Sequence, residues 1–332
     1  MVRRLNSTDA SFAEGFAELL TLKREVSPDV DAVVRDIITA VRAEGDDALL
    51  RYTEKFDRFE IADASRLAIT PDEVTTAKAA CDPKSLKALD LAAERIEAYH
   101  QRQMPKEEKY TDEAGVTLGW RWTPIDAVGL YVPGGLAAYP SSVLMNAIPA
   151  RVAGAERLVM VVPTPDGQLN PLVLAAADRA GVTEIYRIGG AQAVAALAYG
   201  TDSIPPVDKI VGPGNAYVAA AKRQVFGQVG IDSIAGPSEI LVLADGENNP
   251  DWIATDLLSQ AEHDSSAQSI LITDDKAFAD AVAVAAEKLI AESPRSEITQ
   301  AAWTDNSAII TVASLDEGVE LLNRVAPEHL EL

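Results

Sequence analysis

The chain has 332 residues, and its 29 lysines and arginines against 51 aspartates and glutamates give a formal charge of −22. This acidity argues against a nucleic-acid binder, because nothing would neutralise phosphates over a broad face. The 48% apolar and 24% charged content is that of a globular protein rather than a disordered or fibrous one, and the length suggests two domains.

Targeting signals are missing from the sequence. No apolar stretch approaches the roughly 20 residues that a membrane-spanning helix needs. Arg3 and Arg4 are followed by polar residues 6–9 rather than by the apolar core of a signal peptide. The single cysteine, Cys81, excludes an intrachain disulfide and a cysteine-rich metal cluster. We therefore expect a soluble, cytoplasmic protein with no membrane partner.

The first part of the chain is helical. Residues 28–56 begin with Ser27-Pro28-Asp29, a cap residue followed by proline at the first helical position. Apolar residues spaced by three and four then form one stripe on a helix. A second helix is expected over about 84–103, so the chain should begin with an N-terminal helical segment.

From about residue 116 the pattern changes to short apolar runs that alternate with alanine-rich helices. Strands are expected at 128–132, 158–162, 184–188 and 209–211, and helices at about 141–153, 168–180, 191–199 and 215–226. Further strands are expected at 239–244, 268–273 and 307–312, with helices near 251–263, 275–292 and from about 315. Strand–loop–helix repetition predicts an α/β fold with parallel sheets and helices on both faces.

Three glycine loops follow expected strands. They are Tyr131-Val-Pro-Gly-Gly135, Gly189-Gly-Ala-Gln192 and Gly212-Pro-Gly-Asn215. Ligands bind at the carboxyl ends of parallel strands, where glycines allow close approach and amides such as those of Gln192 and Asn215 can bind a nucleotide or sugar. Any one of these loops alone is more typical of a tight turn. Three in one sheet favour a ligand site.

The dinucleotide fingerprint is incomplete. Residues 212–217 match only the first two glycines of G-x-G-x-x-G, with Tyr217 at the third position. Asp232 lies at about the right distance for a ribose-binding carboxylate, although a lone aspartate is usually a turn or cap residue. No phosphate-binding P-loop is present, which argues against a P-loop nucleotidase.

Two further pairs of residues have chemical potential. Gln260 and His263 fall roughly 60° apart on the last turn of the helix near 251–263, a spacing known from zinc sites. On its own this pair is more typical of a helix C-terminus, where a histidine interacts with the dipole. Glu328 and His329 place a carboxylate beside an imidazole, as general acid–base catalysis requires, but a solvent-facing loop pair has the same sequence.

Six motifs together resemble the L-histidinol dehydrogenase family. They are Tyr131-Val-Pro-Gly-Gly135, Arg187-Ile-Gly-Gly-Ala-Gln-Ala193, Asp208-Lys-Ile-Val-Gly-Pro-Gly-Asn-Ala216, Ala235-Gly-Pro-Ser-Glu239, Leu258-Ser-Gln-Ala-Glu-His263 and Ala326-Pro-Glu-His-Leu330. The resemblance covers the chain from about residue 120 to its end, and the helices from about 28 also fit. It implies a zinc-dependent enzyme that oxidises L-histidinol to L-histidine through L-histidinaldehyde with two NAD⁺, the last step of histidine biosynthesis.

The resemblance also assigns residues. Tyr131, Gln192 and Asn215 would contact NAD. Ser238, Gln260, His263 and His329 would contact the substrate. Gln260 and His263 would also be zinc ligands, and Glu328 and His329 would be the catalytic acid–base pair.

The implied architecture is a domain-entwined homodimer with two incomplete Rossmann-like domains. We expect an N-terminal arm over 1–27, a discontinuous catalytic and zinc domain over 28–130 and 238–332, and an NAD-binding domain over 131–237. Family members continue beyond the Pro-Glu-His motif with a tail that supplies an Asp and a His to zinc and a Glu to the substrate. That tail is absent here, so the sequence matches the first three-quarters of the enzyme.

Two alternatives stay open at this point. One is a related NAD-dependent dehydrogenase that oxidises another small diol. The other is a catalytically incomplete, dimerising remnant that binds little zinc.

Overall fold

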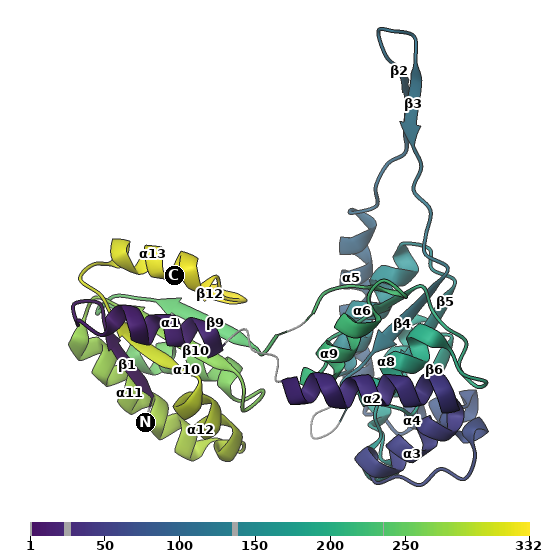
Figure 1. Ribbon diagram of the computed structural model, residues 1–332, viewed down its shortest axis with the longest axis horizontal. Helices are drawn as coiled ribbons and strands as arrows, with labels where there is room; N and C mark the ends of the chain where they lie inside the picture. The colour runs from purple at the N-terminus through teal and green to yellow at the C-terminus, as the bar shows by residue number, and fades with distance from the viewer. Residues whose placement is uncertain (1, 23–27, 135–138, 235) are drawn as a thin grey trace. The chain divides into compact units, whose positions relative to one another are not determined.

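A computed structural model describes residues 2–22, 28–134, 139–234 and 236–332 (Figure 1). The chain divides into two compact units. We call residues 26–235 the continuous unit, and residues 1–25 with 236–332 the split unit. Among the described helices, none combines the length and apolar content needed to cross a membrane.

The continuous unit contains a sheet of five parallel strands in the order β6-β5-β4-β7-β8. The strands are β4 (Ala127–Tyr131), β5 (Arg157–Val161), β6 (Glu184–Tyr186), β7 (Lys209–Val211) and β8 (Gly230–Ile231). The central strand β4 pairs with β5 on one side and β7 on the other. The connections therefore leave β4 in opposite directions, which makes the gap between β4 and β7 a topological switch point.

Helices cover both faces of this sheet (Figure 1). They are α2 (Pro28–Glu44), α3 (Asp46–Asp57), α4 (Pro71–Ala79), α5 (Pro83–Gln101), α6 (Pro140–Val152), α7 (Pro171–Ala180), α8 (Gly190–Tyr199) and α9 (Ala216–Val225). Helices α2, α3, α8 and α9 pack into one core, and α5, α6 and α7 into the other. Residues of β5 alternate between the two cores, with Leu158 in one and Val159 in the other, as the two-residue period of a strand requires.

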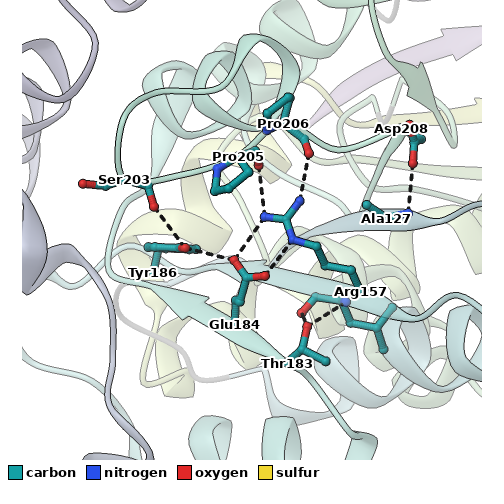
Figure 2. A network of polar contacts seen from close by, with 10 residues as sticks. Ala127, Arg157, Thr183, Glu184, Tyr186, Ser203, Pro205, Pro206 and Asp208 are labelled. Atoms are coloured by element: carbon teal, nitrogen blue, oxygen red, sulfur yellow. Dashed lines mark hydrogen bonds and ion pairs between the residues drawn. The ribbon is translucent and has the colours of Figure 1, made fainter.

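A polar network closes the amino-terminal edge of this sheet (Figure 2). Arg157, at the start of β5, donates from Nε to Glu184 at the start of β6 at 2.6 Å, and its other nitrogens donate to the carbonyls of Pro205 and Pro206. The hydroxyl of Tyr186 donates to Glu184 Oε2 at 3.0 Å. The hydrogen bond from Arg157 lowers the pKa of Glu184, so this carboxylate stays ionised.

A two-stranded antiparallel hairpin interrupts the continuous unit. It consists of β2 (Glu108–Thr111) and β3 (Thr117–Trp120), and all eight residues are exposed. Figure 1 shows the hairpin standing well away from the sheet of its own unit.

The split unit has a second five-stranded parallel sheet in the order β1-β11-β10-β9-β12. The strands are β1 (Arg3–Asn6), β9 (Glu239–Leu243), β10 (Gln268–Thr273), β11 (Ala308–Thr311) and β12 (His329–Glu331). The helices α10 (Pro250–Ala261), α11 (Lys276–Glu292) and α12 (Ser296–Asp305) pack on one face, and α1 (Phe12–Leu22) and α13 (Leu315–Val325) on the other.

The predicted α/β fold is therefore confirmed: two parallel sheets, each with helices on both faces. The predicted domain boundary at residue 131 is wrong. Residues 28–130 belong with 131–235, because β4 supplies the central strand of the sheet and α2 packs on α8 and α9. The N-terminal segment is no separate arm either, since β1 pairs with β11 and Phe16 and Leu19 of α1 are buried in the core of the split unit.

Candidate functional site

The carboxyl ends of β4 and β7 meet at the switch point of the continuous unit. Tyr131 is the last residue of β4, and Gly212 directly follows β7. Gly212 has a φ of +111°, and a Cβ there would lie 2.1 Å from the carbonyl oxygen of Tyr131. Only glycine fits so close an approach. Open α/β sheets bind ligands at such a crevice.

Tyr131 is almost completely buried at this edge. Its hydroxyl accepts a hydrogen bond from the backbone N–H of Gly190 at 3.0 Å, which ties the end of β4 to the start of α8. Burial raises the pKa of Tyr131 to about 12. The phenol therefore stays neutral near pH 7 and keeps a proton that it can donate to a ligand.

Gln192 lies in the first turn of α8 and is 1% exposed. Its Oε1 has no hydrogen-bond partner among the described residues. Leaving a buried acceptor without a partner costs free energy. A ligand that donates an N–H or O–H here would remove that cost.

Asn215 is the N-cap of α9. Its Oδ1 accepts from the backbone N–H groups of Tyr217 and Val218 at 3.1 and 3.2 Å. The side chain is exposed, and its NH₂ group takes no part in the cap, so it is available to a ligand. The three residues assigned to NAD thus lie on one edge of one sheet.

Asp232 has a different task from ribose binding. Its Oδ2 accepts a hydrogen bond from the N–H of Gly212 at 2.8 Å, and its Oδ1 pairs with the buried Lys222. Both carboxylate oxygens of Asp232 therefore already have partners within the protein, which favours the interpretation of Asp232 as a turn residue rather than a ribose ligand.

A buried aspartate at the same edge has no counterpart in the sequence analysis. Asp57, the last residue of α3, is 7% exposed, and its Oδ2 accepts from the N–H of Thr164 at 3.2 Å. Burial raises the pKa of Asp57, and the Thr164 hydrogen bond offsets this only in part. Nothing in the charged run of α3 singles out this residue, because its burial depends on the loop after β5.

The remaining predicted residues gather at the amino-terminal edge of the split-unit sheet. Ser238 directly precedes β9 and is half-buried, and its carbonyl accepts from the N–H of Gln268 at 2.9 Å. His329 begins β12 and pairs in parallel register with Ile240 of β9. Glu328, one residue earlier, therefore lies at the level of the first residue of β9.

Helix α10 brings Gln260 to the same place. Asp256 on α10 contacts Glu331 on β12. From Asp256 to Gln260 the helix rises about 6 Å. From Glu331 back to His329 the strand covers nearly the same distance. Since α10 runs opposite to the strands that flank it, Gln260 lies at the level of His329.

His263 lies just beyond the end of α10. Its backbone N–H donates to the carbonyl of Gln260 at 3.0 Å, and its own carbonyl accepts from Arg295 at 3.3 Å. The imidazole is exposed. Gln260 and His263 are thus one turn apart at the edge that also carries Ser238.

The Glu328 and His329 side chains form a loose pair. His329 Nε2 lies 4.0 Å from Glu328 Oε1, and the two side chains are 51% and 58% exposed. Both side chains are more than half exposed, so both can reorient toward a bound molecule. Next to them, burial and the Asp256 carboxylate raise the pKa of Glu331.

The metal-binding potential of this edge is partial. Gln260 and His263 offer one amide oxygen and one imidazole nitrogen, whereas a zinc site takes four ligands. In the described parts of the chain, no group of three or more His, Cys, Asp and Glu side chains could hold a metal ion. Two donors fit half of a zinc site.

The comparisons agree on one family. The histidinol dehydrogenase family profile matches residues 21–332. Over 332 aligned residues, the chain is 62% identical to a histidinol dehydrogenase of Mesorhizobium japonicum and 64% identical to one of Rhizobium meliloti. The chain belongs to the histidinol dehydrogenase family. It spans 77% and 76% of the lengths of those two relatives.

A crystal structure of the family has the same fold. The histidinol dehydrogenase of Elizabethkingia anophelis is 35% identical and superposes with a TM-score of 0.87, covering 99% of this chain and 75% of that one. His100 and the single cysteine, Cys81, have local roles in this histidinol dehydrogenase family member. His100 is hydrogen-bonded to Gln103 on the surface of α5, and Cys81 packs at the margin of an apolar core.

Replacing Asp57 by asparagine tests whether this carboxylate costs stability. The raised pKa means that the folded state holds its proton more tightly than the unfolded state. The free energy of unfolding therefore falls as the pH rises from the ordinary value through the raised one. We expect Asp57→Asn to unfold at higher urea concentration at pH 7, with the difference narrowing as the pH is lowered.

Asp57→Ala is the matched variant. It leaves the buried N–H of Thr164 without its acceptor and should cost about 1–3 kcal/mol. An Asp57→Asn protein that is less stable than the unmodified protein at pH 7, with the deficit shrinking as the pH is lowered, would show instead that the ionised form is stabilising.

Proposed function

We propose that this protein is an NAD⁺- and zinc-dependent histidinol dehydrogenase that oxidises L-histidinol through L-histidinaldehyde to L-histidine. The observation that carries the proposal is the gathering of Ser238, Gln260, Glu328 and His329 at one sheet edge. The 60–64% identity to histidinol dehydrogenases over the aligned chain supports the same reaction and disfavours a dehydrogenase of another diol.

NAD⁺ would bind at the carboxyl edge of the continuous unit. Gln192 Oε1 is a buried acceptor in need of a donor, which a carboxamide or a ribose hydroxyl can supply. The hydroxyl of Tyr131 and the NH₂ of Asn215 supply donors. NAD⁺ accepts the hydride in each of the two oxidations.

Zinc would be held in part by Gln260 and His263, with its other ligands from outside the described residues. Bound zinc supplies Lewis-acid binding of the amine and imidazole of histidinol. Ser238, at the same edge, has a hydroxyl that can bind the substrate.

Glu328 and His329 would move the protons. The imidazole of His329 can take the proton from the alcohol when hydride leaves. Glu328 can take a proton from the water that adds to the aldehyde. The gem-diol formed in this way is the species that the second oxidation converts to the carboxylate.

The stoichiometry of the reaction tests the proposal. With limiting L-histidinol and excess NAD⁺, we expect two NADH and one L-histidine for each histidinol. Glu328→Gln should slow the aldehyde oxidation by roughly 10²–10⁴-fold while the alcohol oxidation suffers less, and His329→Asn should slow both. Formation of NADH from another amino alcohol but not from histidinol would refute the assignment.

Metal content tests the two zinc donors. We expect the double variant Gln260→Ala/His263→Ala of the full-length protein to lose most of its zinc in elemental analysis. The control is His100→Ala, which removes a histidine of α5 that is not proposed as a ligand and should leave the zinc content unchanged. Unchanged zinc in the double variant would show that these side chains are not ligands.

We also propose that the protein is a homodimer in which the hairpin β2–β3 contacts a second copy. A two-stranded hairpin is at best marginally stable alone, and here the apolar side chains of Val116, Leu118 and Trp120 are 44–51% exposed. Exposed apolar patches of this kind mark interaction sites.

Leu118→Asp should shift the protein toward the monomer in analytical ultracentrifugation, because it places a charge in that contact. Val284, on α11 of the split unit, is 69% exposed, and Val284→Asp serves as the control. A dimer of unchanged stability in Leu118→Asp would exclude the hairpin from the interface.

A further inference from the structure

Lys222 is a charged side chain in the interior of the continuous unit. It lies on α9 and is 2% exposed, among the largest fully buried side chains of the described chain. A buried ammonium group is costly unless it is paired and hydrogen-bonded. Its Nζ donates to the carbonyl oxygen of Gly212 at 2.9 Å and forms an ion pair with Asp232.

Asp232 completes the arrangement. Its second carboxylate oxygen accepts from the N–H of Gly212 at 2.8 Å. The ion pair therefore binds both backbone polar groups of Gly212: Lys222 donates to its carbonyl, and Asp232 accepts from its N–H. Gly212 itself has a φ of +111° and abuts the carbonyl oxygen of Tyr131.

The segment that follows Gly212 leads to the cofactor-side asparagine. Asn215 caps α9 from three residues further along, and Lys222 reaches back to Gly212 from the second turn of the same helix. Residues 212–215 are thus fixed at both ends by side chains. A loop that is already ordered loses less entropy when a ligand binds.

We propose that the Lys222–Asp232 pair positions this loop for the cofactor, and that Lys222 is a positioning residue for NAD⁺ binding. The inference rests on the proposed function, because it takes residues 212–215 as part of an NAD⁺ site. Lys222 acts through Gly212 and contacts no reactant.

A purely structural ion pair would have a different signature. Arg157 and Glu184 form a partly buried pair in the same sheet, but at its amino-terminal edge (Figure 2). Breaking that pair removes stability at the edge opposite to the cofactor. A variant that breaks the Arg157–Glu184 pair is therefore the control: it should lower stability without changing the affinity for NAD⁺.

The experiment is NAD⁺ titration by isothermal calorimetry of the full-length protein and four variants, with thermal unfolding of each. Lys222→Met keeps the volume of the side chain and removes its donor. Asp232→Asn is the second variant, and it should fold because this side chain is 33% exposed. Asn215→Ala reports on the site itself, and Arg157→Met is the control.

We expect Lys222→Met and Asp232→Asn to weaken NAD⁺ binding by about tenfold, the loss of one charge-assisted hydrogen bond. Arg157→Met should lower the unfolding temperature with unchanged NAD⁺ affinity. In kinetics, the KM for NAD⁺ should rise in Lys222→Met while the KM for histidinol stays within about twofold.

Three results would overturn the inference. The first is that both Lys222→Met and Asp232→Asn bind NAD⁺ as tightly as the unmodified protein. If Asn215→Ala binds NAD⁺ more weakly in the same experiment, this result leaves the proposed function intact. The inference would also fail if Arg157→Met lost as much NAD⁺ affinity as Lys222→Met and Asp232→Asn do. Failure of the unmodified protein to bind NAD⁺ would reject the proposed function and the positioning role together.

Discussion

The pairing of β4 with a strand on each side is the constraint on which the geometry of the carboxyl edge of the continuous unit depends. Because β5 and β7 flank it, the ends of β4 and β7 are neighbours, and the backbones of Tyr131 and Gly212 come within van der Waals range. This contact leaves room only for glycine. The positions of the tyrosine hydroxyl and the α9 cap then follow from where those two strands end, and the hydroxyl in turn bonds the N-terminus of α8, which follows β6.

The two sheets place polar residues at opposite ends of their strands. In the continuous unit, Tyr131 and Asn215 lie at the carboxyl edge, the usual position for ligands of open parallel sheets. In the split unit, Ser238 and His329 lie at the amino edge, next to the C-terminal end of α10. A helix C-terminus carries partial negative charge, so this edge suits a cation or a protonated amine better than a phosphate.

The features that repeat along the chain could be predicted from the sequence. The features that depend on which strands and helices pair in space could not. Alternation of apolar runs with alanine-rich helices predicted both parallel sheets, and the six motifs contained every residue that the resemblance assigned to a site, but not the buried Asp57 at the carboxyl edge. The boundary at residue 131 was wrong, because order along the chain does not show which strand is central. The hairpin β2–β3 was not predicted: Val116, Leu118 and Trp120 do alternate along the chain, but neither strand has a face buried in a core. Lys222 resembles an ordinary surface lysine until its helix is packed, although its spacing of four from buried Val218 was a signal.

The place of β12 at the end of its sheet has a consequence for the lifetime of the proposed acid–base pair. Three exposed residues, held along one side by β9, form the outermost strand of the described ladder. Short outer strands open by local fraying at a free energy far below that of global unfolding. Glu328 and His329 can therefore lose their position while both cores stay intact, so the durability of the proposed acid–base pair depends on the pairing of β12 with β9 rather than on how much apolar surface the protein buries.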